Sequence, residues 1–230
     1  MRGRHWWIAI LFIIGSSLFG LGAMPYYSEA VGLRATALTF FIGSVFFSAA
    51  AFLQYRATVD DLPMARRRAR RFWVWAPRDL AWLACAVQLA GTLWFNWSTG
   101  NALRSNLGAT AADERVWRPD VLGSVAFLVA SGLAWIDAAH GGGGRARTRE
   151  WWIGAANMLG SIAFGVSAVA AYVVPASGDV RNAEVSNLGT LLGAICFLIG
   201  AILLLPSPTP TAGAGCTALP AISAVEGVRP

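Results

Sequence analysis

Four polar side chains that stand inside apolar runs are the residues of this chain best placed for chemistry. Gln88, Thr92 and Asn96 follow one another at intervals of four residues, so a helix would carry them in one stripe. Asn157 lies three residues before a glycine, as Gln88 does, and we expect it to face this stripe. Amides and hydroxyls form hydrogen bonds without ionising. The four side chains would therefore either join neighbouring helices, at about 0.6 kcal/mol per contact, or line a passage for a small neutral solute.

The sequence lacks the usual sets of catalytic and metal-binding residues. Its two histidines, His5 and His140, fall outside the apolar runs. No run contains the carboxylate pair or the histidine beside a serine that acid–base and nucleophilic catalysis require, and no histidine-rich metal site is present. We also expect no charged side chain inside a run, because an intramembrane charge costs at least ~2.5–3.5 kcal/mol. The chain is therefore predicted not to be an enzyme and to bind no cofactor.

A short motif, Gly-(Ser/Thr/Ala)-x-x-Phe, recurs in each apolar run. Its glycine and phenylalanine positions are Gly15 and Phe19, Gly43 and Phe47, Gly91 and Phe95, Gly123 and Phe127, Gly160 and Phe164, and Gly193 and Phe197. A separation of four residues places both on one helix face, where the glycine opens a gap that the phenylalanine flanks. Close packing at small residues holds helices together in lipid. The motif therefore predicts a tightly packed bundle, and the alternative is a ring of glycines that lines a pore or a substrate pocket.

The apolar runs have the length that a helix needs to cross a bilayer. Hydrophobic residues make up 56% of the chain and charged residues only 13%, whereas a soluble domain is about one quarter charged. The predicted spans are 6–24, 36–54, 80–98, 120–136, 151–174 and 187–205. We expect an all-α integral membrane protein with six transmembrane helices, arranged as three tandem hairpins over residues 1–205. Residues 206–230, rich in Pro, Ser, Thr, Ala and Gly, are predicted to form a disordered cytoplasmic tail.

The distribution of arginine predicts the orientation in the membrane. All 18 basic residues are arginines. If the N-terminus is cytoplasmic, thirteen of them fall on the cytoplasmic side and five on the other side, as the positive-inside rule requires. Both termini are therefore expected in the cytoplasm. The use of arginine alone is typical of GC-rich coding, and we expect a bacterial source and the cytoplasmic membrane.

The densest charge lies between the second and third runs, in a segment that also holds Trp73 and Trp75. Its members are Arg66, Arg67, Arg68, Arg70 and Arg71. Such a cluster fixes topology and can dock onto anionic lipid headgroups at roughly 1 kcal/mol per arginine. The pI of about 10.0 is explained by this one-sided placement, so nucleic acid is not an expected partner.

Several stretches resemble the YrhK-like family of membrane proteins, in particular its long actinobacterial members. The similar segments are 41–47 and 121–127, which carry the glycine–serine pair, together with 51–56, 87–92 and 116–120. The resemblance covers most of residues 6–205. It implies a small multi-pass membrane protein of undefined molecular activity, and it supplies no catalytic residues.

Two function classes follow from these observations. The first is a structural or interaction protein of the cytoplasmic membrane, with a homo-oligomer formed through its small-residue faces. The second is a permease or channel for a small neutral solute along Gln88, Thr92, Asn96 and Asn157. Convergence of these four side chains on a water-accessible cavity would favour the second class, whereas polar groups buried singly between helices would favour the first.

Overall fold

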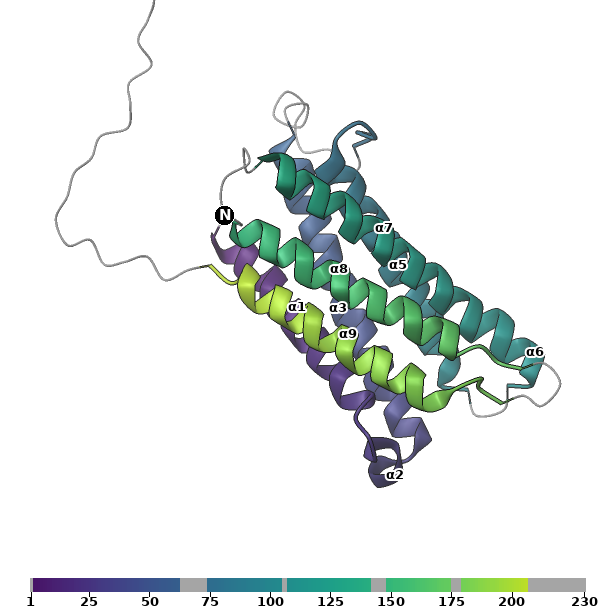
Figure 1. Cartoon of the computed structure of the whole chain (residues 1–230). Coiled ribbons are helices and arrows are strands. Elements are labelled where there is room, and N and C mark those ends of the chain that lie inside the picture. The colour runs from purple at the N-terminus through teal and green to yellow at the C-terminus, as the bar shows by residue number, and fades with distance from the viewer. Residues whose placement is uncertain (1, 63–73, 105–106, 142–147, 175–178, 207–230) are drawn as a thin grey trace, which may run out of the picture.

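The computed structural model describes residues 2–62, 74–104, 107–141, 148–174 and 179–206. Its described part contains six helices of 21 to 29 residues (Figure 1). They are α1 (Arg2–Gly22), α3 (Leu33–Asp61), α5 (Leu80–Ala102), α7 (Arg118–Gly141), α8 (Arg149–Ala170) and α9 (Ala183–Leu204). Short α2 (Tyr27–Val31), α6 (Ala109–Ala112) and the π-helical η1 (Asp113–Trp117) complete the described helices. The expected all-α class is confirmed for this part of the chain.

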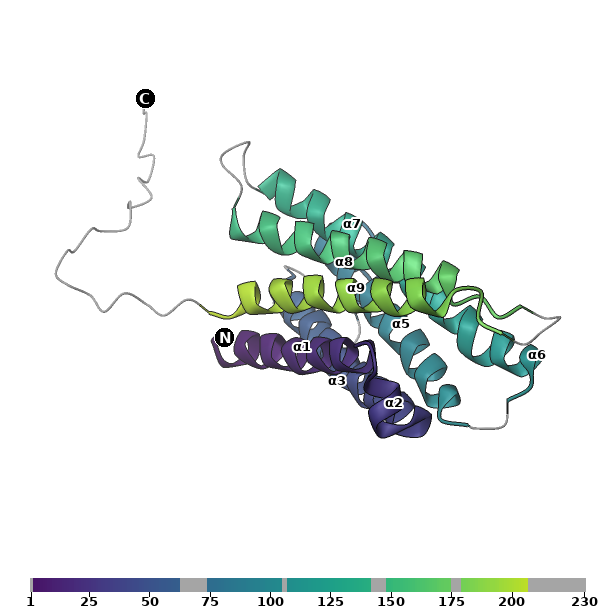
Figure 2. The same ribbon diagram turned by 60° about the horizontal axis from the view of Figure 1, so that its bottom comes forward.

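The six long helices form a closed ring. Each packs against the long helices before and after it in the chain, and α9 closes the ring against α1. The pairs α1–α3, α5–α7 and α8–α9 make the most extensive interfaces, so the ring consists of three hairpins. Figure 2 shows α2 and α6 together at the end of the bundle opposite the N-terminus, which we call the distal end. The start of α1 and the end of α9 lie at the other, proximal end.

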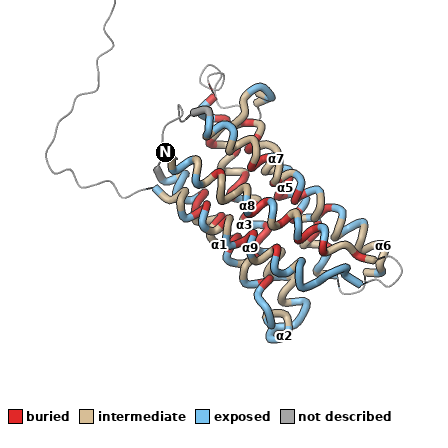
Figure 3. The backbone as a smooth tube through the Cα atoms, in the orientation of Figure 1, coloured by how far each residue is buried: buried red, intermediate tan, exposed pale blue. Residues whose placement is uncertain are grey.

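The outer surface of the ring is apolar. Exposed side chains include Ile42, Val125, Ile162, Leu192 and Ile199, whereas the interior buries small and aromatic residues (Figure 3). Five helical segments are long and apolar enough to cross a membrane: Gly3–Gly22, Leu33–Asp61, Ala109–Ala139, Arg149–Ala170 and Ala183–Leu204. Helix α5 falls outside this set because Gln88, Asn96 and its tryptophans lower its mean hydropathy. Of the six predicted spans, five thus meet this criterion.

Polar residues define where several helices begin. Asp79, Thr148 and Asn182 each accept a hydrogen bond from a backbone N–H of the first turn of α5, α8 and α9, respectively, which satisfies a donor that the helix itself leaves unpaired. Helix α8 ends at Ala170 rather than at the predicted residue 174. The chain turns there because the backbone of Tyr172 and Val174 pairs with that of Arg181 and Asp179.

The expectation that no charge lies inside an apolar run stays a prediction, and Asp120 is the residue that bears on it. We predicted this residue as the first of its span, at the membrane surface. In the structure α6, η1 and α7 follow one another without a break, so Asp120 lies within one continuous helix, Ala109–Ala139, that is long and apolar enough to cross a membrane. The same helix also contains Asp113, Glu114, Arg115, Arg118 and Asp137. The arginine cluster at 66–71 and the predicted tail from 207 onward lie outside the described residues.

Candidate functional site

Each hairpin is held by a reciprocal contact between its two motifs. In the first hairpin a Cβ atom added to Gly15 would lie 2.9 Å from Cδ2 of Phe47, and one added to Gly43 would lie 2.9 Å from Cδ2 of Phe19. The second and third hairpins repeat this with Gly91 on Phe127, Gly123 on Phe95, Gly160 on Phe197 and Gly193 on Phe164. The sequence interpretation placed each phenylalanine beside the gap of its own helix. The ring instead fills the gap in the partner helix.

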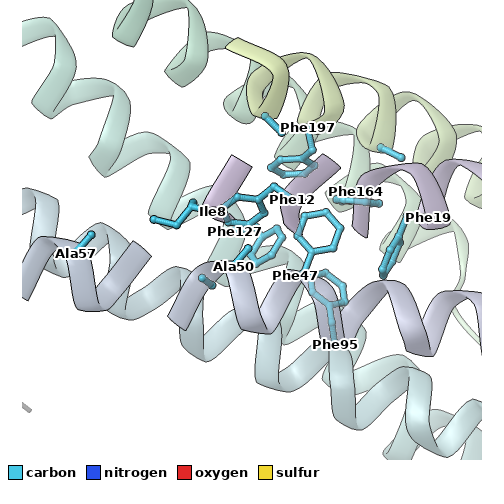
Figure 4. Packing of buried hydrophobic residues seen from close by; sticks show 13 residues of the cluster. Ile8, Phe12, Phe19, Phe47, Ala50, Ala57, Phe95, Phe127, Phe164 and Phe197 are labelled. Carbon is cyan, nitrogen blue, oxygen red and sulfur yellow. The ribbon is translucent and has the colours of Figure 1, made fainter. Parts of the chain in front are cut away.

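The six motif phenylalanines meet on the axis of the bundle (Figure 4). We call this group the phenylalanine plug. Phe19, Phe95 and Phe164 form one triangle, with ring centroids 5.9–6.5 Å apart. The other three, Phe47, Phe127 and Phe197, form a second triangle, at 5.6–6.3 Å. Each hairpin contributes one ring to each triangle, and the centroids of these two rings lie 5.1–5.4 Å apart.

The plug fills the middle of the bundle with aromatic rings. Its six members expose only 3–8% of their surface, and most of their ring pairs are edge-to-face, the arrangement that aromatic quadrupoles favour. At this level the glycines face phenylalanine rings. The alternative of a pore lined by a ring of glycines is therefore wrong in this conformation.

A large cavity lies on the distal side of the plug. This distal cavity has a volume of about 560 Å³, and the triangle of Phe19, Phe95 and Phe164 forms part of its lining. Helices α3, α5, α7, α8 and α9 also contribute polar side chains: Thr36, Ser98, Thr99, Asp120, Ser124, Ser167, Ser186, Asn187 and Thr190. Such a size and mixed lining are typical of small-molecule sites.

Asp120 is the charged side chain of the distal cavity, among the described residues that line it. Arg118, two residues before Asp120 in the sequence, is already paired with another carboxylate. Arg118 forms an ion pair with Asp113 at 2.8 Å, and Arg181 lines a separate groove on the outer surface of α7, α8 and α9. The structure gives the Asp120 carboxylate no cationic partner within the described residues.

A small cavity lies on the proximal side of the plug. This proximal cavity, of about 50 Å³, is lined by Phe12, Phe197 and the three amide residues Gln54, Gln88 and Asn157. The buried Oε1 atom of Gln54 has no hydrogen-bond partner among the described residues. A cavity needs only about 10–15 Å³ and two to four polar groups to hold a water molecule. The proximal cavity therefore has both the room and the polar groups for ordered water.

Both cavities follow one rule of position. In α1, α5 and α8 the residue three before the motif glycine is Phe12, Gln88 or Asn157, and all three line the proximal cavity. In α3, α7 and α9 it is Phe40, Asp120 or Thr190, and all three line the distal cavity. From the sequence we compared this spacing only for Gln88 and Asn157. Extending it to the other three helices would have revealed Asp120 and Thr190.

The four predicted polar residues separate into two groups. Gln88 and Asn157 meet at the proximal cavity, whereas Thr92 and Asn96 do not line it. Thr92 is fully buried, and its hydroxyl donates to the backbone oxygen of Leu89 in the same helix. Asn96 donates to the Ser48 hydroxyl at 2.7 Å and so joins α5 to α3. Of this second group, only Asn96 joins two helices by a hydrogen bond.

Hydroxyl pairs join the hairpins to one another. The hydroxyls of Ser44 and Thr99 lie 2.9 Å apart between α3 and α5, and those of Ser131 and Ser161 lie 2.8 Å apart between α7 and α8. At the third junction, α9 with α1, an added Cβ at Gly20 would meet only the methyl group of Ala194, at 3.7 Å. No protein-family model, curated protein or solved structure matches this chain, so its function is argued from this geometry.

Proposed function

We propose that this chain is a six-span protein of a bacterial cytoplasmic membrane that acts as a permease or channel for a small polar solute along the bundle axis. The observation that carries the proposal is the placement of a polar cavity on each side of the phenylalanine plug. A solute would enter the distal cavity, pass the plug and leave through the proximal cavity. The proposal involves neither catalysis nor a cofactor. The resemblance to the YrhK-like family stays a prediction.

Two features of the ring support the inclusion of α5 as a sixth span. Its exposed face carries Leu93, Trp94 and Trp97, and its polar residues Gln88, Thr92 and Asn96 are turned toward other helices or a cavity. In addition, the start of α1 and the end of α9 lie at the same end of the bundle (Figure 1). An even number of crossings is required for that.

The orientation follows from the arginine distribution. The proximal end holds Arg4, Arg56 and Arg149, and the cluster at 66–71 follows α3 at that end in the sequence. By the positive-inside rule this end is cytoplasmic, with both termini inside and the cluster placed to meet anionic lipid headgroups. The distal cavity would then open to the outside of the cell.

The phenylalanine plug explains how such a pathway would be closed at rest. Apolar constrictions gate channels by excluding water, and two stacked triangles of phenylalanine make such a constriction between two polar cavities. Passage would require displacement of these rings, which contact one another rather than charged groups. The plug therefore acts as the gate of the proposed pathway.

A second candidate function is the structural or interaction protein expected from the sequence. The reciprocal packing of glycine and phenylalanine favours it, together with the buried Thr92 and the hydrogen bond of Asn96 to Ser48 of the next helix. We expected its homo-oligomer to form through the small residues of the motif. Ser16, Ser44 and Ser161, which follow motif glycines, are fully buried within one chain, so an oligomer would need another surface.

Cysteine labelling in intact cells tests the pathway. In a background with Cys85, Cys196 and Cys216 replaced by alanine, Thr190→Cys should react with a membrane-impermeant thiosulfonate added outside. Leu192→Cys is the matched control, because it lies in the same helix but its side chain is exposed on the apolar outer surface. It should not react, since a thiol in lipid does not ionise. An unreactive Thr190→Cys would instead support the sealed bundle of the second candidate.

A further inference from the structure

We propose that the distal cavity binds a small organic monocation, such as a primary ammonium compound, with its charged group at Asp120. The inference rests on the proposed function in one respect only, that solute reaches this cavity from the outside. It goes further because it gives the ligand a charge and a chemical class. From the sequence alone we expected a neutral solute.

Asp120 gives the distal cavity an acidic group. Asp120 lies on α7, seven residues before the plug ring Phe127, lines the cavity and has no cationic partner among the described residues. Residues 105–106 and 175–178, which lie outside the described residues and follow α5 and α8 in the sequence, include no charged residue that could supply one. Ionisable residues at membrane depth pair with a charge or mark a substrate pathway. A cationic ligand would provide the missing partner.

Aromatic rings form part of the lining of the distal cavity. The rings of Phe19, Phe95 and Phe164 form one side of the cavity, and Phe40 and Trp117 lie on its walls. The Trp117 indole is held in place because its Nε1 donates to the backbone oxygen of Ala168 at 2.9 Å. Organic ammonium groups bind aromatic rings through cation–π attraction, which is worth about 2 kcal/mol or more when desolvated. A cavity lined by both a carboxylate and such rings suits an organic cation.

The same lining is unsuited to a bare metal ion. Hard metal ions take six or more oxygen ligands, and the described residues contain no cluster of three or more ionisable metal ligands. The hydroxyls of Ser98 and Ser167 are already donated to the backbone oxygens of Val116 and Ser186. The cavity volume of about 560 Å³ also fits a molecule of several heavy atoms.

Binding measurements with a charged probe and its neutral counterpart test the inference. Benzylammonium and benzyl alcohol have nearly the same shape and differ in charge. Each would be titrated onto the full chain in lipid nanodiscs by calorimetry, with empty nanodiscs subtracted. The wild type should bind benzylammonium at least tenfold more tightly than benzyl alcohol. Asp120→Asn should abolish this preference and leave benzyl alcohol binding unchanged, whereas Asp120→Glu should keep it.

Glu114→Gln is the matched control, because it removes one negative charge at the same end from an exposed side chain outside the cavity. It should leave the preference intact. Equal binding of both probes to the wild type, or an unchanged preference in Asp120→Asn, would overturn the inference and leave the proposed pathway standing. Displacement of benzylammonium by potassium chloride but not by choline chloride would overturn it in favour of an alkali-ion site. Failure of both probes to bind overturns it too, and an unlabelled Thr190→Cys would then reject the pathway itself.

Discussion

The phenyl ring of Phe127 lies directly over Gly91, with its Cδ1 atom 2.9 Å from the position that a Cβ atom would occupy there. The same hairpin contains the reverse contact, Phe95 over Gly123. Each glycine therefore makes room for a ring from the opposite helix, and each ring reaches the bundle axis through that room. The repeat thus builds the helix interfaces and the phenylalanine plug with the same residues.

Replacement of Gly91 by alanine should destabilise the bundle. The new methyl group would lie 2.9 Å from Phe127 and 3.0 Å from the Ala126 Cβ atom, and the latter cannot rotate away. Overpacking of this kind costs about 1–3 kcal/mol. Unfolding in a detergent titration, followed by circular dichroism, would measure the loss. Gly3→Ala should be neutral because nothing lies within 4 Å of its Cβ position, and equal stability of both variants would contradict the packing role.

The positions of the helices could be predicted from the sequence, whereas the contacts between one helix and the next could not. The spacing of Gly and Phe identified six packing faces, because both residues return to one side of a helix after four positions. Spacing within a helix cannot say which ring enters which gap, since that depends on the distance and direction between two helices. The contact of Phe47 with Gly15 therefore became visible only in the structure.

Only part of the candidate site could be predicted from the sequence. Gln88 and Asn157 were recognised because amides stand out in the middle of an apolar run, and they share the proximal cavity. Asp120 stands near Arg118 and was read as part of the polar boundary of its run. Its position inside the bundle arises because the helix begins several residues earlier, at Ala109. Helix ends are the feature that sequence patterns define least well.

Removal of one plug ring should connect the two cavities. We expect Asn157→Cys, in the background without native cysteines, to be unreactive toward an external thiosulfonate while the plug is complete. Adding Phe127→Ala should make it reactive, because the lost ring contacts Phe47, Phe95 and Phe197 and leaves a space beside the axis. The labelled fraction after a fixed exposure time is the measurement.

Phe41→Ala is the control for this experiment, since Phe41 packs near Gly100 and is not part of the plug. It should leave Asn157→Cys unreactive. Labelling of Asn157→Cys behind an intact plug would show that the phenylalanines are not the barrier, and absence of labelling after Phe127→Ala would show that another barrier exists.

The hydroxyl pair between Ser131 and Ser161 should contribute modestly to stability. Both side chains are buried, their oxygens are 2.8 Å apart, and Ser161 also donates to the backbone oxygen of Phe127. Interhelical hydrogen bonds in membranes average about 0.6 kcal/mol, so a double-mutant cycle with alanine should give a coupling of that size. Ser16→Ala should be neutral or stabilising, because the buried Ser16 hydroxyl has no described partner. A coupling near zero would mean that this pair does not stabilise the α7–α8 junction.

The position of the Asn157 amide should depend on the absence of a side chain at Gly200. A Cβ atom there would lie 2.6 Å from Oδ1 of Asn157, closer than two such atoms approach in a folded protein. Gly200→Ala should therefore turn the amide out of its rotamer, at a cost of about 0.5–1.5 kcal/mol of stability. In the double variant Gly200→Ala with Asn157→Ala, the clash is absent, so the two losses should not add and the double variant should be more stable than their sum. Additive losses in the same unfolding titration would show that the α8–α9 interface yields at this point, and that Gly200 does not fix Asn157 beside the proximal cavity.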